Sequence, residues 1–144
     1  GTGTTYATTP MGADHTAGNL ILGREGVDAT KPEGQKRASH DIQIYAAVLD
    51  GMGFCNFVGG ARPIMEIIAQ LMTKAYGKEY TTEDIIEFGK NILRNELKFN
   101  RAAGLTKADD CMPEFVKTEP LEPTGLVYDV PDEDLHSLFE DIEQ

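Results

Sequence analysis

Three stretches of the chain place apolar residues at the three- and four-residue spacing of an amphipathic helix. The first runs from Gln35 into Asp50, the second from Pro63 to just before Gly77, and the third from the cap Thr81-Thr82-Glu83-Asp84 to residue 101. No alternation of strands and helices accompanies them, so the pattern predicts an all-α fold. The apolar faces comprise Ile42, Tyr45, Ala46, Val48 and Leu49; Ile64, Ile67, Ile68, Leu71 and Met72; and Ile85, Phe88, Ile92, Leu93 and Leu97.

The two ends of the chain lack this regularity. Residues 1–36 show no helical or strand period and contain scattered glycines, so we expect a loop-like first third. Residues 102–130 carry three prolines and are expected to be extended and irregular. Pro131 then opens a last short helix with an apolar stripe of Leu135, Leu138, Phe139 and Ile142. The predicted plan is a loop region (1–36), a helical core (37–104) and an irregular tail with a terminal helix (105–144).

Charge is distributed unevenly over the 144 residues, whose net charge is −11. Residues 105–144 hold 12 acidic and 2 basic side chains, whereas the preceding 104 residues are nearly neutral. An acidic chain lacks the basic footprint of a nucleic-acid binder. The acidic tail is expected to be a solvated face; the alternative is that it docks on a basic partner.

A row of cations follows the third predicted helix. Lys90, Arg94, Lys98 and Arg101 lie toward its C-terminal end, where positive charge suits the helix dipole. We therefore expect this row to be a solvent face rather than a binding patch.

The sequence predicts a compartment and a context. Its longest apolar stretches are too short to span a membrane, and its two cysteines are too few for a disulfide scaffold. These features favour a cytoplasmic protein. The chain begins at Gly1 without an initiator Met or a signal peptide, so we expect it to be part of a longer protein.

The strongest candidate for chemistry is the segment from Asp50 to Asn56, where the first predicted helix ends. Gly51 and Gly53 allow the backbone to approach a ligand, a carboxylate can accept hydrogen bonds from a heterocycle, and Cys55 can offer a thiolate to a metal. The alternative is an ordinary glycine-rich helix end followed by a buried cysteine.

A second candidate is the segment from Pro10 to Asn19. Its small residues surround His15, whose imidazole could act as a general acid or base. The alternative is that Asp14 and His15 form an ordinary Asx-type turn.

Metal-binding motifs are otherwise missing from the sequence. It contains no Cys-x-x-Cys, no His-Glu-x-x-His and no calcium loop. An iron–sulfur cluster ordinarily takes four thiolates. If Cys55 binds such a cluster, the other three thiolates must come from elsewhere.

These segments carry a family resemblance. The run from Tyr6 to Asn19 and the later Asp50-x-x-Gly53-Phe54-Cys55 resemble the C-terminal portion of the tungsten- or molybdenum-dependent aldehyde ferredoxin oxidoreductases. The closing segment, from Lys98 to Asp110 and from Tyr128 to Leu135, is similar to one branch of that family. The family signature has Leu where this chain has Phe54.

The resemblance implies roles for particular residues. Asp50 would contact one of two pterin ligands of the metal, with Gly53, Phe54 and Asn56 shaping that contact, and Cys55 would complete a [4Fe–4S] cluster. His15 would lie near the metal and move protons. The family's Cys-x-x-Cys-x-x-x-Cys triplet and its N-terminal sheet domain are absent from these 144 residues, so the chain alone is expected to bind no cofactor and to be inactive.

The resemblance also implies a function for the longer protein. It would oxidise an aldehyde to a carboxylate at a tungsto- or molybdopterin centre and pass electrons through [4Fe–4S] to ferredoxin or a similar carrier. The partners of this chain would be the N-terminal part of the same protein, the carrier and a possible second copy. The competing hypothesis is a non-catalytic helical interaction module whose acidic tail docks a basic partner.

Overall fold

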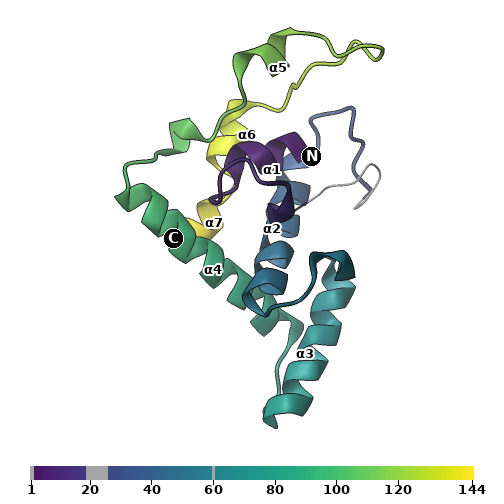
Figure 1. Cartoon of the computed structure of the whole chain (residues 1–144), viewed down its shortest axis with the longest axis vertical. Helices are drawn as coiled ribbons and strands as arrows, with labels where there is room; N and C mark the ends of the chain where they lie inside the picture. Colours follow the sequence, from purple (N-terminus) through teal and green to yellow (C-terminus); the bar gives the residue numbers. More distant parts are fainter. Residues whose placement is uncertain (1, 19–25, 60) are drawn as a thin grey trace.

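Three long helices form the frame of the molecule (Figure 1). The computed structural model describes residues 2–18, 26–59 and 61–144, and in these residues it contains helices and no strand. The predicted all-α class is confirmed. The helices are α1 (Thr2–Thr8), α2 (Gln35–Gly51), α3 (Arg62–Tyr76), α4 (Thr82–Ala102), α5 (Glu114–Thr118), α6 (Asp132–His136) and α7 (Glu140–Glu143), with the short 3-10 turns η1 (His15–Ala17), η3 (Asn56–Val58) and η4 (Lys107–Asp109).

The three predicted amphipathic helices lie close to their expected bounds. Local signals explain this agreement: Pro63 sits in the first turn of α3, Gly77 ends α3 in the left-handed conformation, and Thr81 caps α4 through a reciprocal hydrogen-bonded box with Asp84. Gly1 and Asn19, both named in the sequence-based predictions, lie outside the described residues, as do Gly23, one of the scattered glycines of residues 1–36, and Gly60, just before the second predicted helix.

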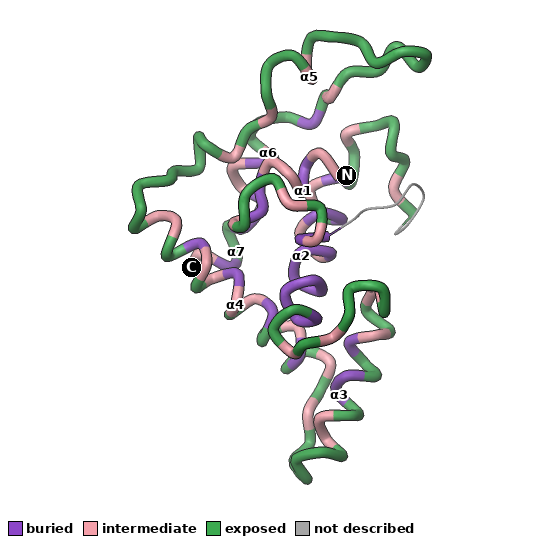
Figure 2. The backbone as a smooth tube through the Cα atoms, viewed as in Figure 1, coloured by how far each residue is buried: buried purple, intermediate pink, exposed green. Residues whose placement is uncertain are grey.

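The core is centred on the crossing of α2 and α4, and Figure 2 shows the buried positions concentrated along α2. Gly89 lets the two helices approach closely, because a Cβ atom there would lie 2.6 Å from the carbonyl oxygen of Ile44. Val48, Leu49, Met65 and Ile85 are almost completely buried around this crossing.

The C-terminal segment (residues 130–143) supplies the last layer of the core. Its apolar residues Leu135, Leu138, Phe139 and Ile142 are all buried, as their spacing predicts. They do not form one helix, however: α6 ends at His136 and α7 begins at Glu140. The break at Ser137 lets Lys36 donate a 2.7 Å hydrogen bond to the Ser137 hydroxyl.

Three of the four cations in the row on α4 contact the protein rather than facing solvent as predicted, whereas Lys98 is exposed as predicted. Lys90 pairs with Asp141 at 2.7 Å, Arg94 Nε donates to the carbonyl of Ile142 at 2.8 Å, and Arg101 pairs with Glu143 at 3.0 Å. These contacts join α4 to the C-terminal segment. Part of the acidic tail, expected to be solvated, is therefore bound to the protein's own cations.

The first third is not entirely loop, because residues 2–8 form α1. This helix has weak intrinsic propensity, since it is rich in threonine and contains a glycine. Buried hydroxyl contacts with α2 stabilise it instead: Thr5 bonds Ser39 at 2.8 Å, and the Thr8 hydroxyl accepts a 3.0 Å hydrogen bond from the side-chain amide of Gln43. Thr4 also bonds the hydroxyl of Tyr128, 124 residues away.

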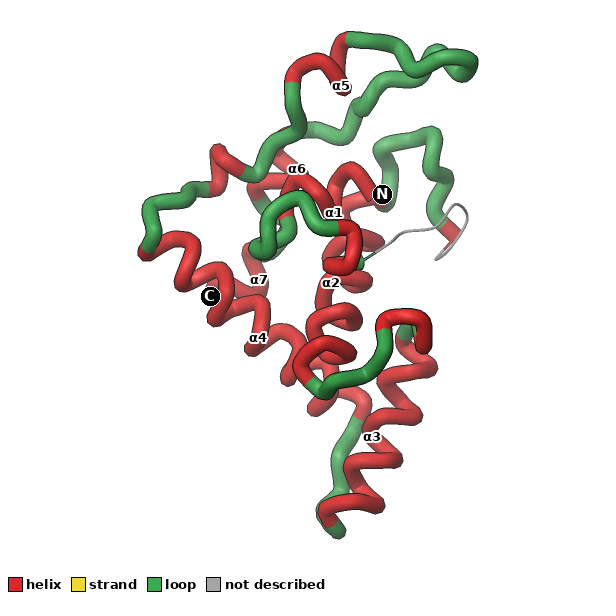
Figure 3. The backbone as a smooth tube through the Cα atoms, viewed as in Figure 1, coloured by secondary structure: helices red, strands yellow, loops and turns green. Residues whose placement is uncertain are grey.

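Residues 103–129 are largely irregular, as predicted, and Figure 3 shows the loops there interrupted by short helices. The part around α5 projects from the rest of the molecule, and an isolated bridge between Leu121 and Leu126 closes its tip. In the described parts of the chain, no helix is long and apolar enough to cross a membrane.

Candidate functional site

The segment from Asp50 to Asn56 turns sharply out of the end of α2. The amide of Phe54 donates a hydrogen bond to the carbonyl of Leu49 at 2.8 Å. The amide of Gly53 donates to the carbonyl of Asp50 at 3.1 Å. Gly53 has a φ of +73°, a conformation that other residues adopt only with strain. The glycine therefore permits the chain to reverse directly after Asp50.

This turn presents Cys55 to solvent. Cys55 precedes η3, and its carbonyl accepts a 3.0 Å hydrogen bond from the amide of Val58. Its thiol is free and exposed, which contradicts the alternative of a buried cysteine. Asn56 is also exposed, and Phe57 is 100% exposed.

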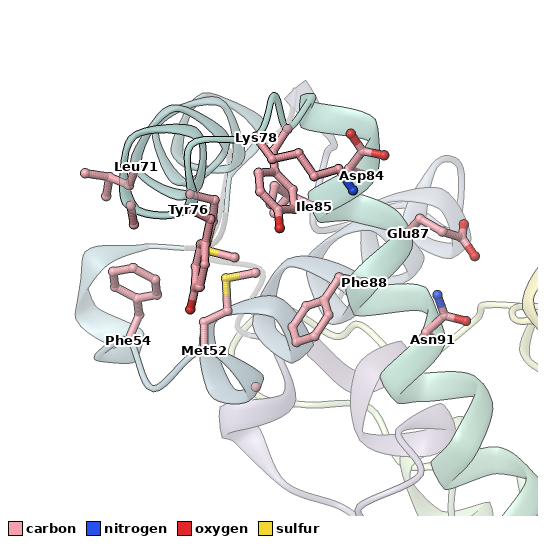
Figure 4. Close-up of a pocket in the computed structure, with 14 residues that line it drawn as sticks. Met52, Phe54, Leu71, Tyr76, Lys78, Asp84, Ile85, Glu87, Phe88 and Asn91 are labelled. Atoms are coloured by element: carbon pink, nitrogen blue, oxygen red, sulfur yellow. The ribbon is translucent and has the colours of Figure 1, made fainter.

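Phe54 and Met52 point in the other direction, toward the protein. Both are partly buried and pack against the core cluster. Figure 4 shows them beside a groove of about 670 Å³ between the end of α2, α3 and the start of α4, with Leu71, Tyr76 and Phe88 on its walls. The apolar side chain at position 54 thus anchors the turn while its neighbours remain accessible.

The segment containing His15 lies against the end of α2. Asp14 accepts hydrogen bonds from the amide and the hydroxyl of Thr16, both at 2.8 Å, and this is the predicted Asx-type turn. These bonds hold the pKa of Asp14 below its ordinary value. His15 is exposed, with Nδ1 3.8 Å from Asp14, so the turn leaves the imidazole accessible.

Asp14 and Asp50 are close enough to influence each other. Partial burial, together with the negative charge of Asp14, raises the pKa of Asp50. The structure therefore brings two candidates, Asp50 and the His15 segment, to the same side of the molecule. Within the described residues, neither of them forms a hydrogen bond or an ion pair with Cys55.

Glu96 belongs to this region and was missed in the sequence. It lies on α4 beside a small cavity of about 40 Å³ that Thr9, Met11, Gln43 and Asp50 also line. Burial and the charge of Asp50 raise its pKa. No sequence signal marks Glu96, because its neighbour is 46 positions earlier in the chain.

The described residues form no self-sufficient metal centre. They contain no group of three or more histidine, cysteine or carboxylate side chains placed to hold a metal ion. The site offers a single exposed thiol, an exposed carboxylate that accepts no hydrogen bond from the described residues, and an accessible imidazole.

Comparisons with known proteins identify the class of protein to which this helical chain with its exposed Asp50–Asn56 turn belongs. The family model described as aldehyde ferredoxin oxidoreductase, domains 2 and 3, matches residues 1–141, so the chain belongs to the aldehyde ferredoxin oxidoreductase family. A curated relative is the tungsten-containing aldehyde ferredoxin oxidoreductase of Pyrococcus furiosus, which is 35% identical over 88 residues. The match covers 58% of this chain and 14% of that relative.

Proposed function

We propose that this chain is the C-terminal helical domain of an oxidoreductase that converts aldehydes to carboxylates at a tungsto- or molybdopterin centre. Electrons would leave through a [4Fe–4S] cluster to ferredoxin or a similar carrier. The observation that carries this proposal is the exposed Cys55, presented by the Asp50–Gly53–Phe54 turn in a chain of this family.

The metal–pterin centre, when bound, supplies the two-electron redox chemistry. In our proposal the exposed Asp50 carboxylate accepts hydrogen bonds from the N–H groups of a pterin ring, since its oxygens accept none from the described protein. Gly53 and Asn56 contribute backbone groups to the same contact, and Phe54 fixes the turn against the core. His15 takes up or releases protons beside the reacting centre.

The donor set of this chain fits one corner of a four-iron cluster. One accessible thiol is present at the site, and four thiolates are ordinarily needed. We therefore propose that the remaining thiolates come from the N-terminal part of the same protein and that the 144 residues alone are inactive.

The two cysteines provide a matched test in the full-length parent protein. Cys55→Ala should remove most of the iron while leaving part of the tungsten or molybdenum bound, because the pterin has further contacts. Cys111 is also a free, exposed cysteine, and Cys111→Ala should leave both metals unchanged. Elemental analysis of the purified variants measures this. Equal iron loss in both variants would refute the assignment of Cys55.

The competing function is docking of a basic partner on the acidic tail. Several of the tail's carboxylates are already paired within the protein: Asp141 with Lys90, Glu143 with Arg101 and Lys107, and Asp132 with Lys117. These pairs reduce the charge available to a partner and favour the oxidoreductase proposal.

The proposal extends to the organisation of the chain. Residues 1–36 would serve as an active-site region, 37–104 as the helical core and 105–144 as the acidic tail. We propose a cytoplasmic location and allow for assembly with a second copy of the protein.

A further inference from the structure

The His15 loop (residues 9–17) has an internal shape that its own hydrogen bonds define. The amide of Gly12 donates to the carbonyl of Thr9 at 3.2 Å, and the Asp14 side chain accepts from the amide of Thr16. Such short-range bonds determine how the loop turns. They do not determine where the loop sits on the helices.

The position of the loop depends on a bond to α4. Asn100 donates from Nδ2 to the carbonyl of Pro10 at 2.8 Å, across 90 positions of sequence. The Pro10 carbonyl can only accept, so the amide nitrogen must face it. Asn100 is half-buried near the end of α4. Its backbone carbonyl accepts a 3.0 Å hydrogen bond from the backbone amide of Leu105.

The other end of the loop is held by packing. Ala17 is only 5% exposed, whereas His15 between the two anchors is exposed. The loop is thus fixed at Pro10 and at Ala17, and the imidazole is presented from the span between them.

We propose that Asn100 is a positioning residue for His15: its hydrogen bond to Pro10 sets where the His15 loop lies relative to Asp50. This inference rests on the proposed role of His15, but the effect of the Asn100–Pro10 hydrogen bond on the loop can be tested without measuring turnover. Without the amide donor, the Pro10 carbonyl loses its partner on α4, and the loop keeps its internal turns, the bond from the Thr9 amide to the Thr5 carbonyl and the anchor at Ala17.

Two variants of the 144-residue chain test the effect of the Asn100–Pro10 hydrogen bond. Asn100→Asp keeps the size of the side chain but places an acceptor beside the Pro10 carbonyl, and Asn100→Leu removes the amide altogether. The control is Asn95→Leu, since Asn95 is an exposed asparagine on the same helix. If Asn100→Leu does not fold, the isosteric Asn100→Asp still answers the question.

Amide hydrogen exchange measured by NMR gives the first readout. In both Asn100 variants the loop, released from α4 at Pro10, should open more often together with its internal turns, so the amides of Gly12 and Thr16 should exchange roughly 2- to 10-fold faster, the range expected for loss of one hydrogen bond. The amides of Leu93 and Leu97 should keep their rates, as should all amides in the control. Unchanged exchange at Gly12 and Thr16, or an equal change in the core amides, would overturn the proposal.

Turnover by the full-length parent gives the second readout. Asn100→Asp should lower kcat and change its pH profile, because the proton-moving group is displaced, while metal and iron contents stay at the wild-type level. A wild-type pH profile would overturn the positioning role. If the parent contains no metal centre, the proposed function fails, and the exchange result still decides whether Asn100 positions the loop.

Discussion

At the scale of single residues, the distinctive feature is a group of three carboxylates, Asp14, Asp50 and Glu96, in which one charge acts on the next. Burial, together with the charge of Asp14, raises the pKa of Asp50, and burial, together with the charge of Asp50, raises the pKa of Glu96. Like charges in a partly desolvated place favour the protonated form. Removing the charge of one of these carboxylates should therefore change the pKa of its neighbour.

Asp50→Asn tests this coupling. The charge of Asp50 is one of the two causes that raise the pKa of Glu96, so the variant should move that pKa down toward its ordinary value of 4.5. Because the pKa of Glu96 is raised in the folded state, Glu96 stabilises the fold at pH values below its unfolded pKa. This contribution to the free energy of unfolding is lost as the pH rises through the folded pKa. NMR titration of the Glu96 carboxyl carbon in both proteins measures the shift. An unchanged pKa of Glu96 in the variant would show that burial alone acts.

His15→Ala separates a catalytic role from a structural one in the full-length parent. If His15 moves protons, turnover should fall by about 10²- to 10⁴-fold with normal metal and iron contents. If His15 serves only the turn, thermal stability and cofactor occupancy should fall together while activity per bound metal stays near wild type. That second outcome would remove His15 from the proposed mechanism.

At the scale of the elements, the C-terminal segment behaves as part of the core rather than as a tail. Its four apolar side chains fill the space beside α2 and α4, and its polar groups meet Lys36, Lys90, Arg94 and Arg101. His40 of α2 adds a further contact, with Nε2 2.9 Å from Asp141. Burial supplies most of the stability of such an attachment, since exposed ion pairs contribute little.

Ile142→Ala should therefore be costly. Ile142 has 0% exposure, and truncation of a fully buried isoleucine costs about 2–5 kcal/mol of unfolding free energy. Leu121→Ala is the control, because Leu121 is 70% exposed in the projecting part near α5 and should change stability by about 0.5 kcal/mol or less. Urea denaturation of the 144-residue chain followed by circular dichroism gives both values. Similar losses in the two variants would contradict the described packing.

At the scale of the whole molecule, the chain has a well-packed centre and an accessible, chemically incomplete site at one end of α2. The exposed Phe57 and Cys55 lie within three residues of each other on that site. A domain of this kind is expected to fold without its redox groups, because its core does not involve them.

The isolated chain should accordingly be helical and colourless. Circular dichroism should report helix, and after treatment with iron and sulfide the visible spectrum should lack sulfur-to-iron charge-transfer absorption, since one thiolate at the site cannot hold a four-iron cluster. A stable brown chromophore with four irons per chain would contradict this expectation and the proposed origin of the other ligands.

The sequence predicts those parts of the fold that depend on neighbours in the chain. The bounds of α3 and α4 follow from Pro63, Gly77 and the Thr81 cap, all of which act within one turn. The helix α1 was not predictable, because its stability comes from distant hydroxyl partners such as Ser39 and Tyr128. The ion pairs of the α4 cations could not be predicted either, because their partners are distant in the sequence. Lys90 and Asp141, for example, are 51 positions apart.

The residues of the candidate site also fall into two groups: those marked by short sequence motifs and those that only tertiary packing brings to the site. Asp50, Cys55 and His15 stand out in short motifs, whereas Glu96 and Asn100 look like ordinary polar residues of a helix surface. Only the packing of α4 against α2 and the N-terminal loop brings them to the site.

The late position of the buried C-terminal side chains in the sequence has a consequence for synthesis. Residues 35–102, which form the frame of α2, α3 and α4, leave the ribosome 40 residues before Ile142 does. At a translation rate of about 5–20 residues per second, the nascent frame waits roughly 2–8 s for its last apolar layer. During that interval the surfaces of α2 and α4 that Leu138, Phe139 and Ile142 later cover are open to water, and the newborn chain is a natural client for a chaperone.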